Sequence, residues 1–175
     1  MNFTSLKIPG AYLIELDLKE DERGFFARAY CEDTFEKKGL NSCWVQCNIS
    51  FNIKEGTLRG MHFQRDPHPE IKIVRCTSGA IYDVILDLRQ DSPTFKQWVA
   101  YELSEKNHRI LYIPAGCAHG FQTLEDNTEV FYQMSTAYFP ECASGVRWND
   151  PAFGIQWANP VNAISEKDQL YANFT

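Results

Sequence analysis

The stretch Leu58-Arg59-Gly60-Met61-His62-Phe63-Gln64 predicts both a β fold and the place of the chemistry. It is apolar enough for a buried strand, yet it carries the functional side chains of Arg59, His62 and Gln64. Strands normally alternate apolar side chains with polar ones that face solvent. Polar groups on a buried strand therefore indicate a pocket, and we expect the active chemistry on this strand.

The geometry of this strand decides which side chains can act together. His62 and Gln64 lie on one face of a regular strand, whereas Arg59 points to the other face. A β-bulge near Gly56 or Gly60 would bring Arg59 to the face of His62, because the extra residue reverses the alternation. Joint use of Arg59 and His62 is therefore conditional on such a bulge.

Similar short stretches on both sides of this strand predict an all-β protein. Apolar or alternating runs separated by turn residues cover residues 11–16, 24–30, 43–51, 57–63, 71–76, 80–88, 96–103, 109–113, 118–124 and 129–138. Many short strands at even spacing are typical of a sandwich or barrel. Two helices are expected, one over residues 31–38 before Gly39 and one over residues 165–172, capped by Ser165 with Asp168 at its third position.

Composition predicts one globular domain over residues 1–175. The chain has 44% hydrophobic, 14% aromatic and 23% charged residues, enough for one sizeable core rich in β structure. The net charge of -6 opposes binding to nucleic acid or to an anionic membrane, and no apolar run approaches the roughly 18 residues of a membrane span. The six cysteines form no Cys-x-x-Cys pair, and no basic and then apolar leader opens the chain. We therefore expect a cytoplasmic protein with reduced, buried thiols.

Other polar side chains are candidates for the site, and each has a purely structural alternative. Gln46, Asn48 and Ser50 alternate along one strand, where they either line a pocket or face solvent from an edge. Lys72 lies in an apolar run and either reaches water from a strand end or is buried for a function. Tyr132 is either part of the site or a core tyrosine with a satisfied hydroxyl.

The segment Pro114-Ala115-Gly116-Cys117-Ala118-His119 looks like the second signature of cupin jelly rolls, a turn that brings a histidine to the barrel mouth. In metal-binding cupins the first signature supplies two histidines and a glutamate, but here His62 is followed by Phe63 and Gln64. His62 and His119 are too few ligands, and His68, flanked by prolines, is a poor third. A metal is not expected. A metal-dependent cupin oxygenase or isomerase remains an alternative.

Motifs along nearly the whole chain resemble the dTDP-4-dehydrorhamnose 3,5-epimerase family. In chain order they are residues 21–26, Gln46 with Asn48, residues 59–64, Lys72, residues 83–89 with 92–94, residues 114–121, Tyr132, Tyr138, residues 148–151 and residues 165–168. So many motifs in one order are far more specific than any single motif. The resemblance implies a cofactor-free, cupin-like double-stranded β-helix (jelly roll) with a few short helices, usually a homodimer. It also implies inversion of carbons beside the ketone of a nucleotide-linked 4-keto-6-deoxyhexose.

The resemblance implies four catalytic residues. Removing a proton from a carbon next to a ketone needs a base on one face and a donor that stabilises the enolate oxygen. By resemblance His62 is the base, and Asp168 fixes its tautomer. Lys72 would stabilise the enolate, and Tyr132 would return a proton from the opposite face, which inverts the carbon.

The resemblance also implies a set of substrate-binding residues. Arg23, reaching across a dimer, and Arg59 would contact phosphates, because guanidinium groups suit them, and Tyr138 would stack on the base. The full set is Arg23, Phe26, Arg28, Gln46, Asn48, Arg59, His119, Tyr138 and Lys167. The family usually has glutamate where this chain has Arg28 and Ala143.

Those two departures leave the substrate open at the level of sequence. A carboxylate replaced by arginine reverses the local charge, so a dTDP-linked sugar is favoured but another nucleotide sugar is an alternative. A single-carbon epimerase, acting at C3 or C5 alone, is the nearest functional alternative. A non-catalytic sugar-binding jelly roll is a further one, although a binding module does not need His62, Lys72 and Tyr132 together.

Overall fold

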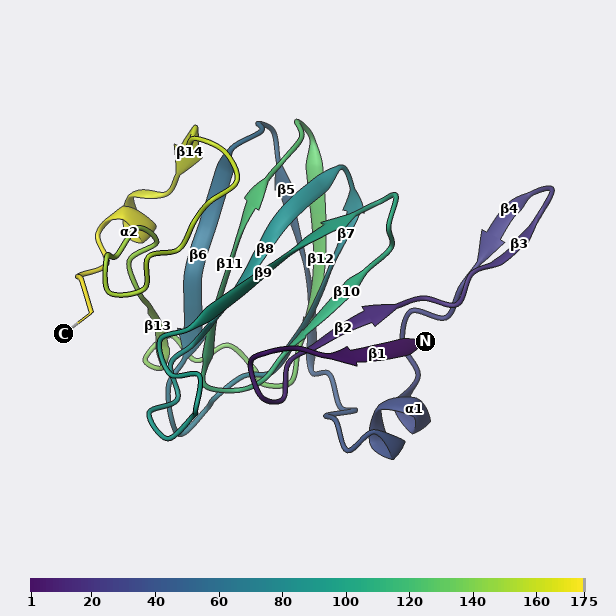
Figure 1. The fold of residues 1–175 in the computed structure, drawn as a ribbon, viewed down its shortest axis with the longest axis horizontal. Helices are drawn as coiled ribbons and strands as arrows, with labels where there is room; N and C mark the ends of the chain where they lie inside the picture. The colour runs from purple at the N-terminus through teal and green to yellow at the C-terminus, as the bar shows by residue number, and fades with distance from the viewer. Residues whose placement is uncertain (175) are drawn as a thin grey trace.

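The computed structural model describes residues 1–174, which form two facing β-sheets and a projecting hairpin (Figure 1). The first sheet contains, in spatial order, β1 (Asn2–Ser5), β2 (Tyr12–Glu15), β10 (Ile110–Ile113), β7 (Lys72–Ser78), β12 (Thr128–Met134) and β5 (Gln46–Asn52). The second contains β13 (Ala143–Gly145), β6 (Thr57–Gln64), β11 (Cys117–Thr123), β8 (Ala80–Asp87) and β9 (Trp98–Ser104). The expected all-β jelly-roll class is confirmed.

The remaining elements lie outside these two strand orders. β14 (Ala163–Ile164) runs parallel to β6, and β3 (Lys19–Asp21) pairs with β4 (Gly24–Phe26) in the hairpin that projects from the body (Figure 1). The two expected helices are present but shorter, as α1 (Glu32–Lys37) and α2 (Glu166–Gln169). The Ser165 hydroxyl caps α2 by accepting a hydrogen bond from the Asp168 amide at 3.1 Å, as its sequence predicts. Neither helix of residues 1–174 is long and apolar enough to cross a membrane.

The hydrophobic core lies between the two sheets. Val74 and Leu111 of the first sheet pack with Ile81 and Ile85 of the second, and all four side chains are fully buried. Apolar side chains of this kind alternate with the outward-facing residues of each strand, which is why the period-two runs of the sequence became strands. Farther along the same interior the side chains become polar, and the candidate site begins there.

A β-bulge interrupts the pairing of β6 with β11. His119 lies opposite His62 and Phe121 lies opposite Arg59, so two residues of β6 span one residue of β11. Gly60 occupies the bulge with φ +133°, a conformation that favours glycine. The bulge brings the side chains of Arg59 and His62 to the same cavity. The bulge near Gly60 that joint use of these two residues requires is therefore present.

Gly60→Ala should destabilise the protein strongly. A Cβ at this position would lie 2.5 Å from the Gly120 Cα, in addition to the strain of a positive φ. Gly24→Ala is a matched control, because Gly24 has φ +123° but no atom within 4 Å of an added Cβ. In urea denaturation we expect the free energy of unfolding to fall by at least about 2 kcal/mol more in the Gly60 variant than in the Gly24 variant. Equal losses would show that the close approach of β6 and β11 is unimportant.

The cysteines only partly follow the expectation that all six are buried. Three are buried, but Cys31 is half-buried and Cys43 and Cys47 are exposed, so the prediction is wrong for these three. Cys47 is exposed because its neighbours Gln46 and Asn48 turn inward on β5, which leaves the intervening side chain on the outer face. No disulfide joins cysteines within residues 1–174.

Candidate active site

Two adjoining hollows between the sheets share the side chains of His62, Lys72 and Tyr132. Their volumes are about 320 and 430 Å³, which suits a small-molecule ligand. The first hollow also includes Arg59 and His119. The second also includes Gln46, Asn48, Gln64, Glu70, Tyr138, Ala143, Lys167 and Tyr171. The three shared residues therefore lie where the hollows meet.

His62 and Asp168 form a closely hydrogen-bonded dyad. His62 Nε2 lies 2.6 Å from Asp168 Oδ1, and the Gly60 amide donates to Oδ2 at 3.2 Å. Burial by itself raises the pKa of the Asp168 carboxyl, but the hydrogen bonds from His62 and Gly60 outweigh it and hold the pKa below its ordinary value. The ionised carboxylate accepts the proton of Nε2, which leaves Nδ1 of His62 to act as a base.

Asp168→Asn should reduce stability at neutral pH and much less in acid. The pKa of Asp168 is lower in the folded protein than its ordinary 3.8, so the folded state binds this proton less tightly than the unfolded state does. The stability contributed by the carboxylate is therefore present above about pH 4 and is lost as the pH falls through the lowered pKa. The difference in urea midpoint between wild type and variant should shrink below about pH 4. A difference that grows in acid would contradict an ionised Asp168.

Tyr132 belongs to the sheet opposite His62. It lies on β12 of the first sheet, whereas His62 lies on β6 of the second, and both side chains line both hollows. Burial raises the pKa of the Tyr132 phenol, Arg59 opposes this shift, and Glu70 reinforces it. The phenol is therefore protonated at neutral pH and can donate a proton from the side opposite the histidine.

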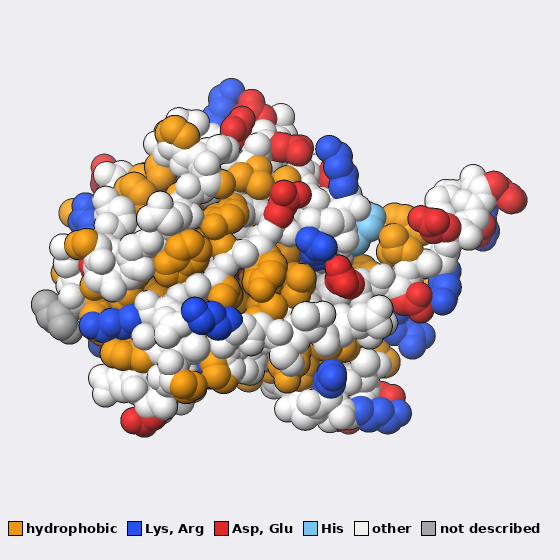
Figure 2. Space-filling view, in the orientation of Figure 1, with side chains coloured by type: hydrophobic (Ala, Val, Ile, Leu, Met, Phe, Trp, Pro, Cys, Tyr) orange, Lys and Arg blue, Asp and Glu red, His pale blue; other side chains and the backbone are white. Residues whose placement is uncertain are grey.

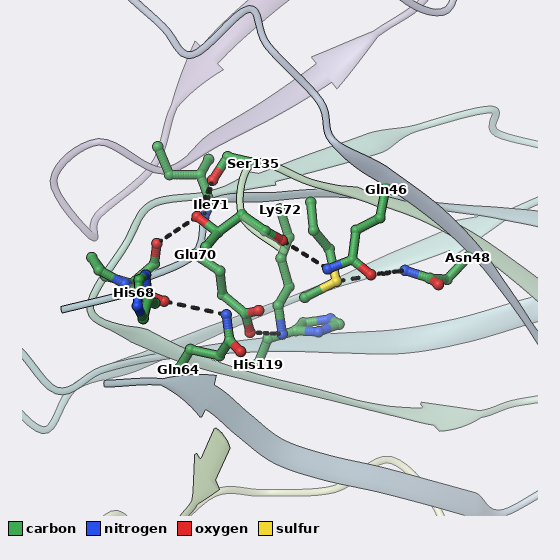
Figure 3. Close-up of polar contacts among 12 residues, drawn as sticks. Gln46, Asn48, Gln64, His68, Glu70, Ile71, Lys72, His119 and Ser135 are labelled. Atoms are coloured by element: carbon green, nitrogen blue, oxygen red, sulfur yellow. Dashed lines mark hydrogen bonds and ion pairs between the residues drawn. The ribbon is translucent and has the colours of Figure 1, made fainter. Parts of the chain in front are cut away.

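Lys72 is buried at the start of β7, which excludes the alternative of a lysine that reaches water. Only 7% of the surface of Lys72 is exposed, and its Nζ lies 2.7 Å from Oε1 of Glu70 (Figure 3). Sequence reasoning did not identify Glu70. The signal was present, because Glu70 and Lys72 are two residues apart and share a side of an extended chain.

His119 is held by a second carboxylate that sequence reasoning missed. Its Nε2 lies 2.9 and 3.0 Å from the two oxygens of Asp83, which is fully buried on β8. Burial raises the pKa of Asp83, while His119 and Lys72 oppose that shift. His119 is also the cross-strand neighbour of His62, so two histidine–carboxylate pairs lie side by side on adjacent strands.

The polar face of β5 turns inward, so the edge-strand alternative with Cys47 and Ile49 inside is wrong. Gln46 Nε2 donates to the Thr136 carbonyl at 2.7 Å, and Asn48 Nδ2 donates to Gln46 Oε1 at 3.3 Å (Figure 3). Ile49 and Cys47 are exposed instead. Because an edge strand exposes one face in any case, sequence alternation did not decide which face points inward.

Gln64 has a structural role at the rim of the second hollow. Its Nε2 donates to the carbonyls of His68 and Ala137 at 3.2 and 3.1 Å, and its Oε1 accepts from the Phe139 amide at 2.7 Å. These bonds satisfy the side chain and tie the loops of residues 65–71 and 135–142 to the end of β6. Gln64 therefore shapes the cavity rather than offering free polar groups to it.

The expected binding residues divide into two groups. Arg59, Gln46, Asn48, His119, Tyr138 and Lys167 lie at the two hollows. Arg23, Phe26 and Arg28 do not lie there within one chain. Arg23 sits at the hairpin tip and pairs with Asp21, while Phe26 and Arg28 line a separate hollow beside the hairpin.

The two histidines of the site are paired with carboxylates. Within residues 1–174, no group of three or more histidine, cysteine, aspartate or glutamate side chains is arranged to hold a metal ion. His62 and His119 each direct Nε2 at a carboxylate. The arrangement instead offers a base, a cation and a phenol around one cavity, which are the groups needed for proton transfer at carbon beside a carbonyl.

Comparisons with known proteins point to one family. The family model described as dTDP-4-dehydrorhamnose 3,5-epimerase matches residues 5–175. A curated relative, dTDP-4-dehydrorhamnose 3,5-epimerase of Sinorhizobium fredii, is 43% identical over 96% of this chain and 87% of its own length.

Solved structures agree with this result. The epimerase of Bacillus anthracis with TDP and PPi bound has a TM-score of 0.96 and 42% identity, over 99% of both chains. ChmJ, a 3'-monoepimerase of Streptomyces bikiniensis in complex with dTDP-quinovose, has a TM-score of 0.90 and 29% identity, over 96% of this chain and 85% of its own. The present chain belongs to the dTDP-4-dehydrorhamnose 3,5-epimerase family.

Proposed function

We propose that this protein is an isomerase that converts dTDP-4-dehydro-6-deoxyglucose to dTDP-4-dehydrorhamnose by inverting C3 and C5. The observation that carries this conclusion is the placement of His62, paired with Asp168, on the sheet opposite Tyr132, with Lys72 beside both. Inversion requires removal and delivery of a proton on opposite faces of the sugar. A base and an acid on facing sheets satisfy that requirement.

The proposed reaction proceeds through an enolate. His62 Nδ1 takes the proton from the carbon next to the C4 ketone, and the bonding pair moves to form a carbon–carbon double bond while the carbonyl pair moves to oxygen. The Lys72 ammonium donates a hydrogen bond to that oxygen as its negative charge develops. The enolate then collapses, and the same carbon takes a proton from the Tyr132 phenol on the opposite face. Solvent restores the phenol proton, and His62 loses its own.

Binding of the nucleotide is proposed for the residues around the two hollows. Arg59 and Lys167 offer positive charge to a diphosphate, and Tyr138, which is 60% exposed, offers a ring on which a base can stack. The Bacillus anthracis relative binds TDP, which supports a thymidine nucleotide. Ala143 lines the second hollow, at the position where the family usually has glutamate.

A single-carbon epimerase is the second candidate, because ChmJ has the same fold and is a 3'-monoepimerase. Product analysis separates the two candidates. After incubation with dTDP-4-dehydro-6-deoxyglucose, borohydride reduction and hydrolysis should release rhamnose and its C4 epimer if both carbons invert. A sugar inverted at C3 alone or C5 alone would establish the second candidate, and unchanged starting configuration would contradict both.

We also propose a homodimer in which the β3–β4 hairpin of one chain reaches the cavity of the other. The hairpin projects as a narrow arm with charged side chains along it (Figure 2), and its Phe26 is 70% exposed. Ile49 and Phe51 of β5 and Ile53 directly after it are exposed, and they form an apolar strip along an edge strand. Both features support contact with a second copy.

Mixing two defective variants tests this dimer. Arg23→Ala damages the hairpin and His62→Asn damages the base, so a mixed dimer contains one intact site. After exchange of subunits the mixture should recover about a quarter of wild-type activity, because about half of the dimers are mixed and each has one intact site of two. No recovery, together with a mass of one 20.2 kDa chain in sedimentation equilibrium, would contradict the shared site.

The remaining properties are proposed on narrower grounds. We propose that residues 1–175 act as one epimerase domain, of which Thr175 lies outside the described residues. Proton transfer by side chains needs neither a metal nor an organic cofactor, so none is proposed. Cysteines that form no disulfide within residues 1–174 support a reducing, cytoplasmic location. Membership of the family favours the epimerase over a metal-dependent cupin or a sugar-binding module.

A further inference from the structure

The ion pair of Glu70 with Lys72 is an unusual feature beside the proposed enolate site. The two side chains are only 5% and 9% exposed, and the carboxylate contacts the ammonium through Oε1 alone (Figure 3). The second oxygen, Oε2, is buried and has no hydrogen-bond partner within residues 1–174. A buried carboxylate that is only half satisfied is a poor stabilising element, which suggests a functional reason for it.

We propose that Glu70 is a positioning residue that keeps the Lys72 ammonium charged and directed at the enolate oxygen. The inference rests on the proposed function, because Lys72 has this task only in an epimerase. An ammonium group taken out of water loses hydration, which disfavours its charged form. A carboxylate 2.7 Å away offsets that loss and also fixes a long, flexible side chain in one position.

The positions of the two residues support this division of tasks. Lys72 lines both hollows, whereas Glu70 lines only the second. Glu70 therefore holds the ammonium from one side, and the remaining N–H groups are left for a ligand at the junction, where His62 and Tyr132 also lie. Within the described part of the chain, the ammonium has no other carboxylate within 4.0 Å.

No other charged group near Lys72 can take the place of Glu70. The titratable and charged groups around the junction are Glu70 before β7, Arg59 and His62 of β6 with Asp168 paired to His62, Asp83 of β8, His119 of β11, Tyr132 of β12, and Tyr138, Lys167 and Tyr171, which line the second hollow. Asp83 and Asp168 are the other carboxylates of this group, but both oxygens of Asp83 already contact His119, and those of Asp168 contact His62 and the Gly60 amide. Loss of the charge at Glu70 would leave Lys72 without a carboxylate in direct contact among the described residues.

Glu70→Gln tests the proposal through the pH dependence of solvent exchange at C3 and C5. Glutamine keeps the shape and can accept from Lys72, but it removes the charge. We expect kcat within about threefold of wild type near pH 6 and reduced at least about tenfold near pH 9, with KM changed less than about threefold, because a buried ammonium without its carboxylate partner gives up its proton more readily as the pH rises. Glu32→Gln, at an exposed glutamate of α1, should follow the wild type throughout.

Two further variants separate positioning from a purely structural role. Glu70→Asp keeps the negative charge, but its side chain is one methylene shorter, so the carboxylate lies farther from the Lys72 ammonium. The pH profile of this variant should resemble that of the wild type, while kcat falls about three- to tenfold. In a Lys72→Met background, Glu70→Gln should change the residual rate less than about twofold, because Glu70 acts through Lys72.

The outcomes are separable. If the wild type exchanges both protons but Glu70→Gln parallels it from about pH 6 to about pH 9, the inference is wrong and the proposed function stands. An equal loss from Glu70→Gln in the wild-type and Lys72→Met backgrounds would also overturn it. Should Glu70→Gln fail to fold, Glu70→Asp decides, since a kcat equal to wild type would show that the carboxylate position is unimportant. A wild type without exchange would overturn both the inference and the function.

Discussion

His62→Asn should lower the rate of solvent exchange at C3 and at C5 together, by about 10²- to 10⁴-fold. Asparagine keeps a polar group beside Asp168, which lies 2.6 Å from the histidine, but it cannot take a proton from carbon. Loss at both carbons is expected because His62 is the proposed base for each inversion. The measurement is proton NMR of the substrate in heavy water.

His68→Asn is the matched control for this variant. The His68 ring stacks on Phe139, with ring centroids 3.6 Å apart, and it does not line either hollow. The His68→Asn variant should exchange the protons at C3 and C5 at the wild-type rates. If His62→Asn retained wild-type exchange at one carbon, a second base would have to act there, and His119, the cross-strand neighbour of His62, would be the first residue to test.

Tyr132→Phe should separate exchange from inversion. Without the phenol, His62 can still remove a proton and return a deuteron to the same face, so exchange continues while inversion stops. We expect product formation to fall by about 10²- to 10⁴-fold and exchange with retained configuration to stay within about tenfold of wild type. NMR coupling constants distinguish retained from inverted carbons.

Tyr82→Phe provides the comparison, because Tyr82 lies on β8 and lines neither hollow. This variant should form product at the wild-type rate. Undiminished inversion in Tyr132→Phe would show that the acid on the opposite face is another group. Loss of exchange and inversion in equal measure would instead mean that Tyr132 is needed for proton removal or for binding.

The strands and much of the site could be predicted from local sequence, because each depends on short-range patterns. Period-two runs predicted the strands around the core, and Ser165 predicted the start of α2. The bulge at Gly60 could only be stated as a condition, since it depends on how β6 pairs with a strand nearly 60 residues away in sequence. β13 and β14 were missed for the same reason, because each is short and is defined mainly by its pairing with β6.

The partners of the catalytic side chains were harder to predict than the side chains themselves. Asp83 lies 36 residues before His119 in sequence, and only the pairing of β8 with β11 brings the two together. Glu70 is close to Lys72 in sequence, but the burial of both residues depends on how the two sheets pack in the folded protein. The side of β5 that faces inward was likewise undecided by alternation, because both of its faces carry plausible side chains.

The most direct test of the central claim is proton NMR of dTDP-4-dehydro-6-deoxyglucose incubated with the wild-type protein in heavy water. The placement of His62 and Tyr132 on facing sheets, with Lys72 between the two hollows, predicts loss of the proton signals at both C3 and C5. It also predicts that the product carries deuterium at both carbons. Persistence of both proton signals after prolonged incubation would contradict the assignment of this cavity as an epimerase site.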